Sequence, residues 1–309
     1  SKATEAIGKT IDFMDDKGSR PVALVSELDA IAEKIRHGNE TKRSDNEIMR
    51  DYLTRVQNEL IEIIELSSSA NNYGYMPVRY QQSQAGRWYG LGSPTLQNCT
   101  RLTRNAALHG FYSFDIESCH HAIVLQIAQN MGIPCENLEH YVSNKEQVRK
   151  ELAKQISVPV SSVKASLIAM IYGAGLNPFG AISKELTPEK LGKALQIPVF
   201  AGLHRELDEI FAAMLKHSGG AESGQVINAL GLSEPFSRRR DDQRRLAAHL
   251  LQGIESQALQ AALSVHKSAI VPLHDGWVCT TPESHVEAEK AIKLATGFNL
   301  QVNPPEQLM

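Results

Sequence analysis

Two aspartates stand where a divalent metal ion could be bound. Asp115 ends the apolar segment FYSFD, and Asp275 lies between AIVPL and WVCTT, so each acid follows an expected strand. Taken singly, Asp115 is equally typical of a helix cap and Asp275 of a tight turn. On neighbouring strands, however, the two carboxylates and the backbone carbonyl of Ile116 could hold two Mg²⁺ ions about 4 Å apart. That chemistry is metal-assisted transfer of a nucleotide to a primer 3′-hydroxyl, with pyrophosphate leaving.

A lysine and a tyrosine follow in the helix expected at residues 161–172. Lys164 and Tyr172 are eight residues apart, a little over two turns, so their side chains lie near one face. Such a pair can hold a triphosphate and a ribose or base. The same spacing also fits a solvated lysine and a buried tyrosine.

Arginines form two groups that could contact phosphates. The first lies within eight positions and comprises Arg238, Arg239, Arg240, Arg244 and Arg245; the looser second group comprises Arg87, Arg101 and Arg104. Arginine suits bidentate phosphate contacts, although a solvated helix of mixed charge has the same composition. The net charge of −3 argues against binding nucleic acid by bulk charge, so positive charge would have to be confined to a cleft.

The elements that would position these residues predict an α+β protein. Apolar residues recur with the helical period over residues 22–36 and 45–66, the second with Ser44 or Asp45 as N-cap. The stretches 67–94 and 218–224 are expected as loops, and Ser161 or Ser162 as a helix cap. Strands are expected over 109–116, 269–273 and 277–280, and further helices over 120–131, 144–155, 161–172, 198–216, 238–266 and 283–295. Helices come first, then mixed elements, then a hairpin, which favours α+β over a doubly wound sheet.

Cysteine usage and hydropathy predict an intracellular setting. Cys99, Cys119, Cys135 and Cys279 are widely spaced and form no CxxC pair. We therefore expect a reducing compartment, cytoplasmic or nucleoid. No apolar run approaches the roughly 20 residues of a membrane span, so no membrane partner is expected.

Taken in order, five motifs resemble those of the superfamily that joins family A DNA polymerases and phage-type single-subunit RNA polymerases. AGRWYGLGSPTLQN (85–98) is similar to the family's TGR loop, and Asp115 matches the acid of motif A. KASLIAMIYGAG (164–175) matches the fingers helix, RRLAAHLLQGIESQAL (244–259) the palm helix, and LHDGWVC (273–279) motif C. The resemblance covers about 220 residues, from Ala85 nearly to the C-terminus.

The resemblance implies a minimal right-hand polymerase with palm, fingers and a small helical, thumb-like N-terminal region. The thumb-like region would be residues 1–80, the palm 81–135 and 231–309, and the fingers 136–230. Asp115, Ile116 and Asp275 would bind two Mg²⁺ ions, for which Mn²⁺ could substitute, and Lys164 and Tyr172 would act beside them. The residues implied at nucleotide or nucleic acid are Arg87, Gln97, His120, Ile168, Gly173, Arg244, His249, Gln252 and His274.

Three positions depart from the family pattern. Val160 occupies the place of an Arg that holds the triphosphate, which leaves that role to Lys154 or another base. His120 replaces the Glu of the DNA enzymes and the Gly of the RNA enzymes. Gly276 replaces the third acid of motif C in the DNA enzymes, which is not the main metal ligand.

The function predicted is DNA-templated nucleotidyl transfer by a primase or compact RNA polymerase that makes short RNA or mixed strands. GRWY and HDGW resemble the RNA branch, whereas SPTLQN and the LQG helix resemble the DNA branch. One alternative is a reduced family A-like DNA polymerase without proofreading; another is a catalytically degenerate nucleic-acid-binding subunit. The expected partners are a DNA template, nucleoside triphosphates, a primer strand and a replication protein that docks on the first twenty residues. Such a compact enzyme would suit a phage or mobile element.

Overall fold

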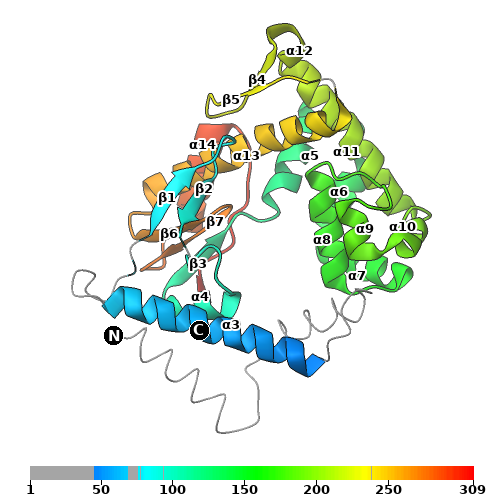
Figure 1. Cartoon of the computed structure of the whole chain (residues 1–309). Helices are drawn as coiled ribbons and strands as arrows, with labels where there is room; N and C mark the ends of the chain where they lie inside the picture. Colours follow the sequence, from blue (N-terminus) through cyan, green and yellow to red (C-terminus); the bar gives the residue numbers. More distant parts are fainter. Residues whose placement is uncertain (1–44, 69–75, 77, 93, 238) are drawn as a thin grey trace.

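The computed structural model of the chain describes residues 45–68, 76, 78–92, 94–237 and 239–309. The expected helix at residues 22–36, the docking segment 1–20 and the cap at Ser44 lie outside the described residues. In the described part, helices surround small antiparallel sheets, so the α+β prediction is confirmed (Figure 1). None of the helices described is both long and apolar enough to cross a bilayer.

A four-stranded antiparallel sheet brings the two expected acidic segments together. Its order is β6 (Ala269–Leu273), β7 (Gly276–Cys279), β3 (Tyr112–Asp115) and β8 (Glu306–Gln307). All three strands expected here form; β6 has the expected bounds, whereas β3 begins three residues late and ends one residue early. The two residues between β6 and β7 make the turn, with His274 in the left-handed region at φ 63°.

Alternating side chains of β7 bury both faces of the sheet. Trp277 and Cys279 belong to the large core that also contains α13 (Arg240–Val265) and α14 (His285–Thr296). Val278, between them, joins a smaller core on the other face, with residues of α3 (Asp45–Ser68) and α4 (Arg101–Ala107). A period of two residues places alternate side chains on opposite faces, so this short apolar strand fills two cores at once.

A helical body extends the large core away from the sheet (Figure 1). It follows α5 (Cys119–Met131), and α7 (Lys145–Ile156) packs against α8 (Val160–Ile171). The other helices of this body are α6 (Glu136–Ser143), α9 (Ala181–Leu186), α10 (Pro188–Ala194) and α11 (Pro198–His217). The cap expected at Ser161 or Ser162 is wrong, because α8 begins one residue earlier, directly after Pro159. Proline has φ set near the helical value and tolerates this position without a side-chain cap.

Both stretches expected as loops contain regular structure. Within 67–94, β1 (Arg79–Gln82) and β2 (Trp88–Leu91) form a hairpin whose turn needs Gly86 at φ 99°. Within 218–224, α12 (Gly220–Ser223) makes one helical turn before the hairpin of β4 (Gln225–Ile227) and β5 (Ser233–Pro235). Polar residues fill β1, so the alternation that reveals a half-buried strand is absent from its sequence.

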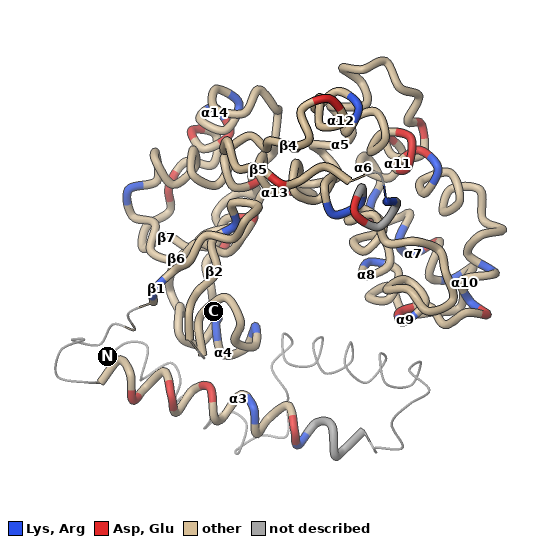
Figure 2. The backbone as a smooth tube through the Cα atoms, turned by 45° about the horizontal axis from the view of Figure 1, so that its top comes forward, with Lys and Arg blue, Asp and Glu red and all other residues tan. Residues whose placement is uncertain are grey.

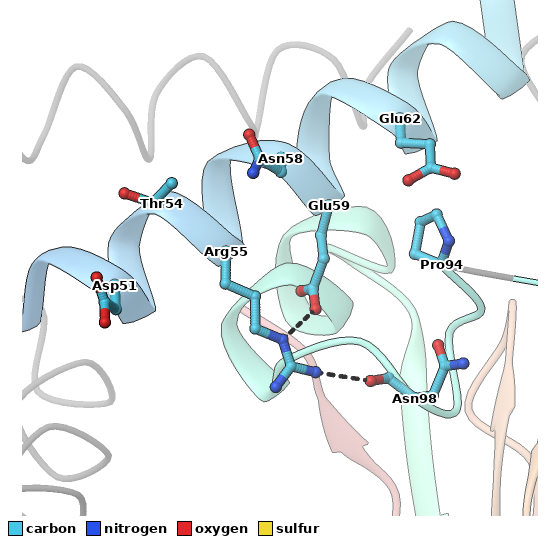
Figure 3. A pocket seen from close by; sticks show the side chains of 8 residues that line it. All are labelled: Asp51, Thr54, Arg55, Asn58, Glu59, Glu62, Pro94 and Asn98. Atoms are coloured by element: carbon cyan, nitrogen blue, oxygen red, sulfur yellow. Dashed lines mark hydrogen bonds and ion pairs between the residues drawn. The ribbon is translucent and has the colours of Figure 1, made fainter. Parts of the chain in front are cut away.

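The long helix α3 is fastened to α4 through one carboxylate. Glu59 accepts hydrogen bonds from the Thr100 N–H at 2.9 Å and the Thr103 hydroxyl at 2.8 Å, at the start of α4. Arg55 donates to Glu59 at 2.8 Å and to the Asn98 carbonyl at 3.1 Å, as Figure 3 shows. These bonds close one wall of a cavity of about 640 Å³ between α3 and residues 94–98. A carboxylate at a helix N-terminus satisfies N–H groups that the helix itself leaves unpaired.

Candidate active site

The two acids lie next to each other, Asp115 at the end of β3 and Asp275 in the turn directly before the neighbouring strand β7, as the sequence predicts. Asp115 is opposite Gly276 in the register of β3 and β7, and the Ile116 N–H donates to the Asp275 carbonyl at 2.9 Å. Both carboxylates line a cavity of about 580 Å³ together with Lys164 and His274. The adjacency is therefore confirmed, whereas metal binding by Asp115, Ile116 and Asp275 stays a prediction.

The electrostatics of this pair favour a cation. Asp115 opens to the cavity, yet the surrounding protein removes part of its hydration, and together with the negative charge of Asp275 this raises the pKa of Asp115 to about 7. Burial, followed by the charge of Glu255, raises the pKa of Asp275. A divalent cation would relieve both effects, because opposite charge favours the ionised form. The donor set therefore fits Mg²⁺, which is commonly held by one or two carboxylates and completes its shell with water and phosphate oxygens. Within the described ranges, no group of three or more His, Cys, Asp and Glu side chains is arranged for a metal ion.

Basic side chains from two parts of the fold border the same cavity. Arg101 and Arg104 come from α4, below the sheet, and Lys164 comes from α8 in the helical body. Figure 2 shows basic residues both on α4 and on the helices around α7 and α8. Lysine and arginine side chains can pair with the phosphate oxygens of a ligand whose metal ions are held by the two carboxylates. The cavity thus combines a place for a cation with positive charge for phosphates.

Behind the acids, a buried charged network joins four segments that are distant in the sequence. Arg87 lies at the end of the turn between β1 and β2. Its Nε and Nη2 donate hydrogen bonds to the two carboxylate oxygens of Glu255 on α13, and the bond from Nη2 measures 2.7 Å. The same Nη2 donates to the Tyr172 hydroxyl at 2.7 Å. His120 completes the group, with Nε2 3.6 Å from Glu255 Oε2 and with its ring edge-on to the Tyr172 ring, the two ring centroids lying 5.0 Å apart. The expected neighbours Arg87, His120 and Tyr172 are therefore brought together.

The charges in this network stabilise one another. Burial alone would raise the pKa of Glu255. The hydrogen bonds and charges of His120 and Arg87 have a larger effect in the opposite direction, so the pKa of Glu255 is lowered to about 2. Burial raises the pKa of Tyr172 to about 12, so this hydroxyl stays protonated. Glu255 is almost fully enclosed, with 1% of its surface exposed. A carboxylate so deeply buried requires a paired cation, and Arg87 supplies it with two-pronged geometry.

Lys164 and Tyr172 do not share one wall of the cavity. Lys164 lines it, whereas Tyr172 is the C-cap of α8 and its hydroxyl is bonded to Arg87. Ile168 is 38% exposed, one turn beyond Lys164 on the same helix. Gly173 has φ 74°, and a Cβ there would lie 2.6 Å from Cγ of Arg244, so α13 approaches the end of α8 closely. This close approach requires glycine at residue 173.

Three other expected binding residues are committed largely to the fold. Gln97 donates to the carbonyls of Trp88 and Pro272, both at 3.0 Å, and accepts from the Gly90 N–H, which ties β2 to β6. His249 is 3% exposed, and its Nε2 donates to the Leu232 carbonyl at 2.9 Å. His274 lines the cavity and meets the Tyr89 ring edge-on at 5.1 Å. Gln97 and His249 therefore have clear structural roles, and their contact with nucleic acid stays a prediction.

The arginines after the β5 hairpin are only partly placed. Arg245 forms an ion pair with Glu234 at 2.5 Å. This pair gives Arg245 a partner within the protein, so its position does not require a bound phosphate. Arg238 lies outside the described residues, and Gln252 is half-buried within α13. Arg239 is exposed, and Arg244 lies against Gly173 and Gly175, so the expected phosphate role of this group stays a prediction.

The sequence reasoning missed Glu255 and Lys145. Glu255 had a visible signal, because Leu251 and Leu259 stand four residues to either side of it in a buried stripe of α13. An acid in such a stripe must find a partner, which the sequence alone does not name. Lys145, the first residue of α7, gave no signal, because its relation to Asp115 depends on the tertiary contact of its side chain with Glu117 and Ser118.

Neither a protein-family model nor a curated protein matches the chain.

Proposed function

We propose that the protein is a DNA-templated nucleotidyltransferase, either a primase or a compact RNA polymerase. The observation that carries the proposal is the placement of Asp115, at the end of β3, next to Asp275, in the turn before β7, beside a cavity that Lys164 also lines. Two carboxylates whose pKa values are both raised, beside a cavity that a lysine of α8 also lines, are suited to metal-assisted phosphoryl transfer. The order of the five motifs along the chain supports the same function.

In this proposal the fold corresponds to a right-hand polymerase. The sheet of β3, β6 and β7 with α13 and α14 would be the palm, the helical body α6 to α11 the fingers, and α3 the thumb-like element. The shared core of the sheet and the helical body supports this division, because it holds α8 beside the acids. The alternative of a nucleic-acid-binding subunit is less consistent with two carboxylates kept next to each other in one cavity.

Each residue then has a chemical task. Asp115 and Asp275 would hold Mg²⁺, which when bound neutralises charge on the phosphates and favours ionisation of the attacking hydroxyl. Lys164 would contact the triphosphate, and Arg101 with Arg104 would contact the strand backbone. Tyr172, with its hydroxyl held by Arg87 and its ring against His120, would face the sugar.

A primer-extension assay tests the proposal and separates its alternatives. Single-stranded DNA template is supplied with Mg²⁺, with or without a primer, and with either NTPs or dNTPs; Asp115→Ala is the control. We expect NTP-dependent products without a primer, absent in the variant. Products formed only from primer and dNTPs would identify a reduced DNA polymerase instead. The absence of product under every condition would contradict the proposal and favour the binding subunit.

A further inference from the structure

A second lysine approaches Asp115 from the helical body. Lys145 begins α7, and its Nζ lies 2.6 Å from Glu117 Oε1 and 3.3 Å from the Ser118 hydroxyl. Glu117 follows Asp115 by two residues, so this ion pair stands beside the candidate metal ligand. The positive charge of Lys145 lowers the pKa of Asp115, and it does so ahead of Lys164.

Two lysines on adjacent helices therefore act on one acid. Lys164 comes from the middle of α8, whereas Lys145 comes from the start of α7, which packs against α8. One turn before Lys164, α8 presents Val160, an exposed apolar residue, so that turn of the helix carries no cation. Nothing described connects Lys154, near the far end of α7, with Asp115. Lys145 therefore places a second lysine charge beside Asp115, through its ion pair with Glu117.

We propose that Lys145 binds the outer phosphates of the nucleoside triphosphate and that Glu117 competes with those phosphates for it, so that substrate binding requires the Lys145–Glu117 pair to open. This inference rests on the proposed nucleotidyl transfer, since it names the residue that completes its triphosphate site. Two acids of the same segment then have opposite effects on the triphosphate. Asp115 would hold the metal ion that favours its binding, whereas Glu117 competes with it for Lys145.

The ion pair is suited to exchange. The Lys145 and Glu117 side chains keep 24% and 38% of their surface exposed, and ion pairs in contact with water stabilise a fold little. A triphosphate offers several charged oxygens in place of one carboxylate, and an ammonium group has three donors on a flexible stem. The polyanion can therefore displace Glu117, whereas the buried pair of Arg87 and Glu255 cannot be opened in the same way.

Calorimetric titration of the full chain with inorganic triphosphate, in the presence of Mg²⁺, tests this inference without requiring polymerisation. The variants are Lys145→Met, Glu117→Gln and the double variant. Lys193→Met is the matched control, because Lys193 forms an exposed ion pair with Glu189 on α10. Thermal melting of each variant establishes that the fold is retained.

We expect Lys145→Met to weaken triphosphate binding about tenfold or more, since it removes charged hydrogen bonds. Glu117→Gln should tighten binding about threefold, because the competing charge is lost. The double variant should bind like Lys145→Met, since Glu117 acts only through Lys145, and Lys193→Met should bind like the unaltered protein.

Weaker or unchanged binding by Glu117→Gln would overturn the inference. The inference would also be overturned if Glu117→Gln changed the affinity for triphosphate in the Lys145→Met background. Absence of triphosphate binding by the unaltered protein would overturn it as well. The expected pattern of affinities in a protein that extends no primer would retain the assignment of a phosphate site and reject the polymerase proposal. The two failures are therefore distinguishable.

Discussion

The backbone N–H of Ile116 donates a 2.9 Å hydrogen bond to the carbonyl oxygen of Asp275. This bond joins segments 159 positions apart in the chain and sets the register in which Asp115 lies opposite Gly276. A slip of one residue would turn either carboxylate to the other face of the sheet, so the register is a condition for a shared cation. The stacked rings of Phe114 and Trp277, 5.4 Å apart, support the same register from within the core.

Replacement of Asp115 by Asn should make the metal-free protein more stable than the unaltered protein at high pH, and not at low pH. The pKa of Asp115 is raised to about 7 in the folded state, so the folded state binds more protons than the unfolded state between about pH 4 and 7. The stability contributed by this group is therefore lost as the pH increases through that window. The free energy of unfolding is measured with urea at pH 4 and pH 8 in the presence of EDTA. The variant should have a higher free energy of unfolding than the unaltered protein at pH 8, and not at pH 4. An equal difference at both pH values would contradict the raised pKa.

Replacement of Glu255 by Gln should destabilise the fold by roughly 3 kcal/mol, because it leaves the buried Arg87 without its anion. The pKa of Glu255 is lowered to about 2, so the stabilisation is complete above the unfolded value near 4.5 and is lost as the pH falls toward about 2. Chemical unfolding at neutral pH and at pH 3 measures both effects. Glu234→Gln is the control, since its partner Arg245 is half exposed and its loss should cost under about 1 kcal/mol. Equal costs for the two variants would refute the special role of Glu255.

Gln97→Ala should act on stability more than on nucleic-acid binding. The Gln97 amide bonds three backbone groups of β2 and β6, so truncation should cost about 1–3 kcal/mol through unpaired polar groups. Gln147→Ala, which removes an exposed bond to Glu151, should change stability little. A normal unfolding midpoint combined with a tenfold loss of DNA affinity would show that Gln97 is mainly a binding residue.

Arg101→Ala should weaken binding of a primer–template duplex and reduce its salt dependence. Arg101 is exposed, lines the cavity and lies on α4, so we expect it to contact one phosphate. The slope of log affinity against log salt should then fall by about 1, for every template sequence alike. Fluorescence anisotropy over a salt series measures the slope, with the exposed Arg205 on α11 replaced as control. An unchanged slope would remove Arg101 from the path of the nucleic acid.

Local sequence patterns predicted the acids but not their surroundings. Asp115 and Asp275 each end or follow a short apolar run, and such runs specify strands through neighbouring residues alone. The hairpin of β1 and β2 was not predicted, because β1 is polar and the turn depends on Gly86. The partners Arg87 and Glu255 are 168 residues apart, so only the folded chain reveals their contact. For the same reason the proximity of Lys145 to Asp115 became visible only from its folded-state contact with Glu117.

The most direct test of the central claim is addition of a single nucleotide on four primer–template duplexes that differ only in the first unpaired template base. The protein is supplied with Mg²⁺ and one nucleotide at a time. We predict that only the complementary nucleotide is added on each template, and that Asp115→Asn and Asp275→Asn each reduce the rate at least about a thousandfold. Addition that ignores the template base, or that survives in both variants, would contradict the assignment of a templated transfer to these two acids.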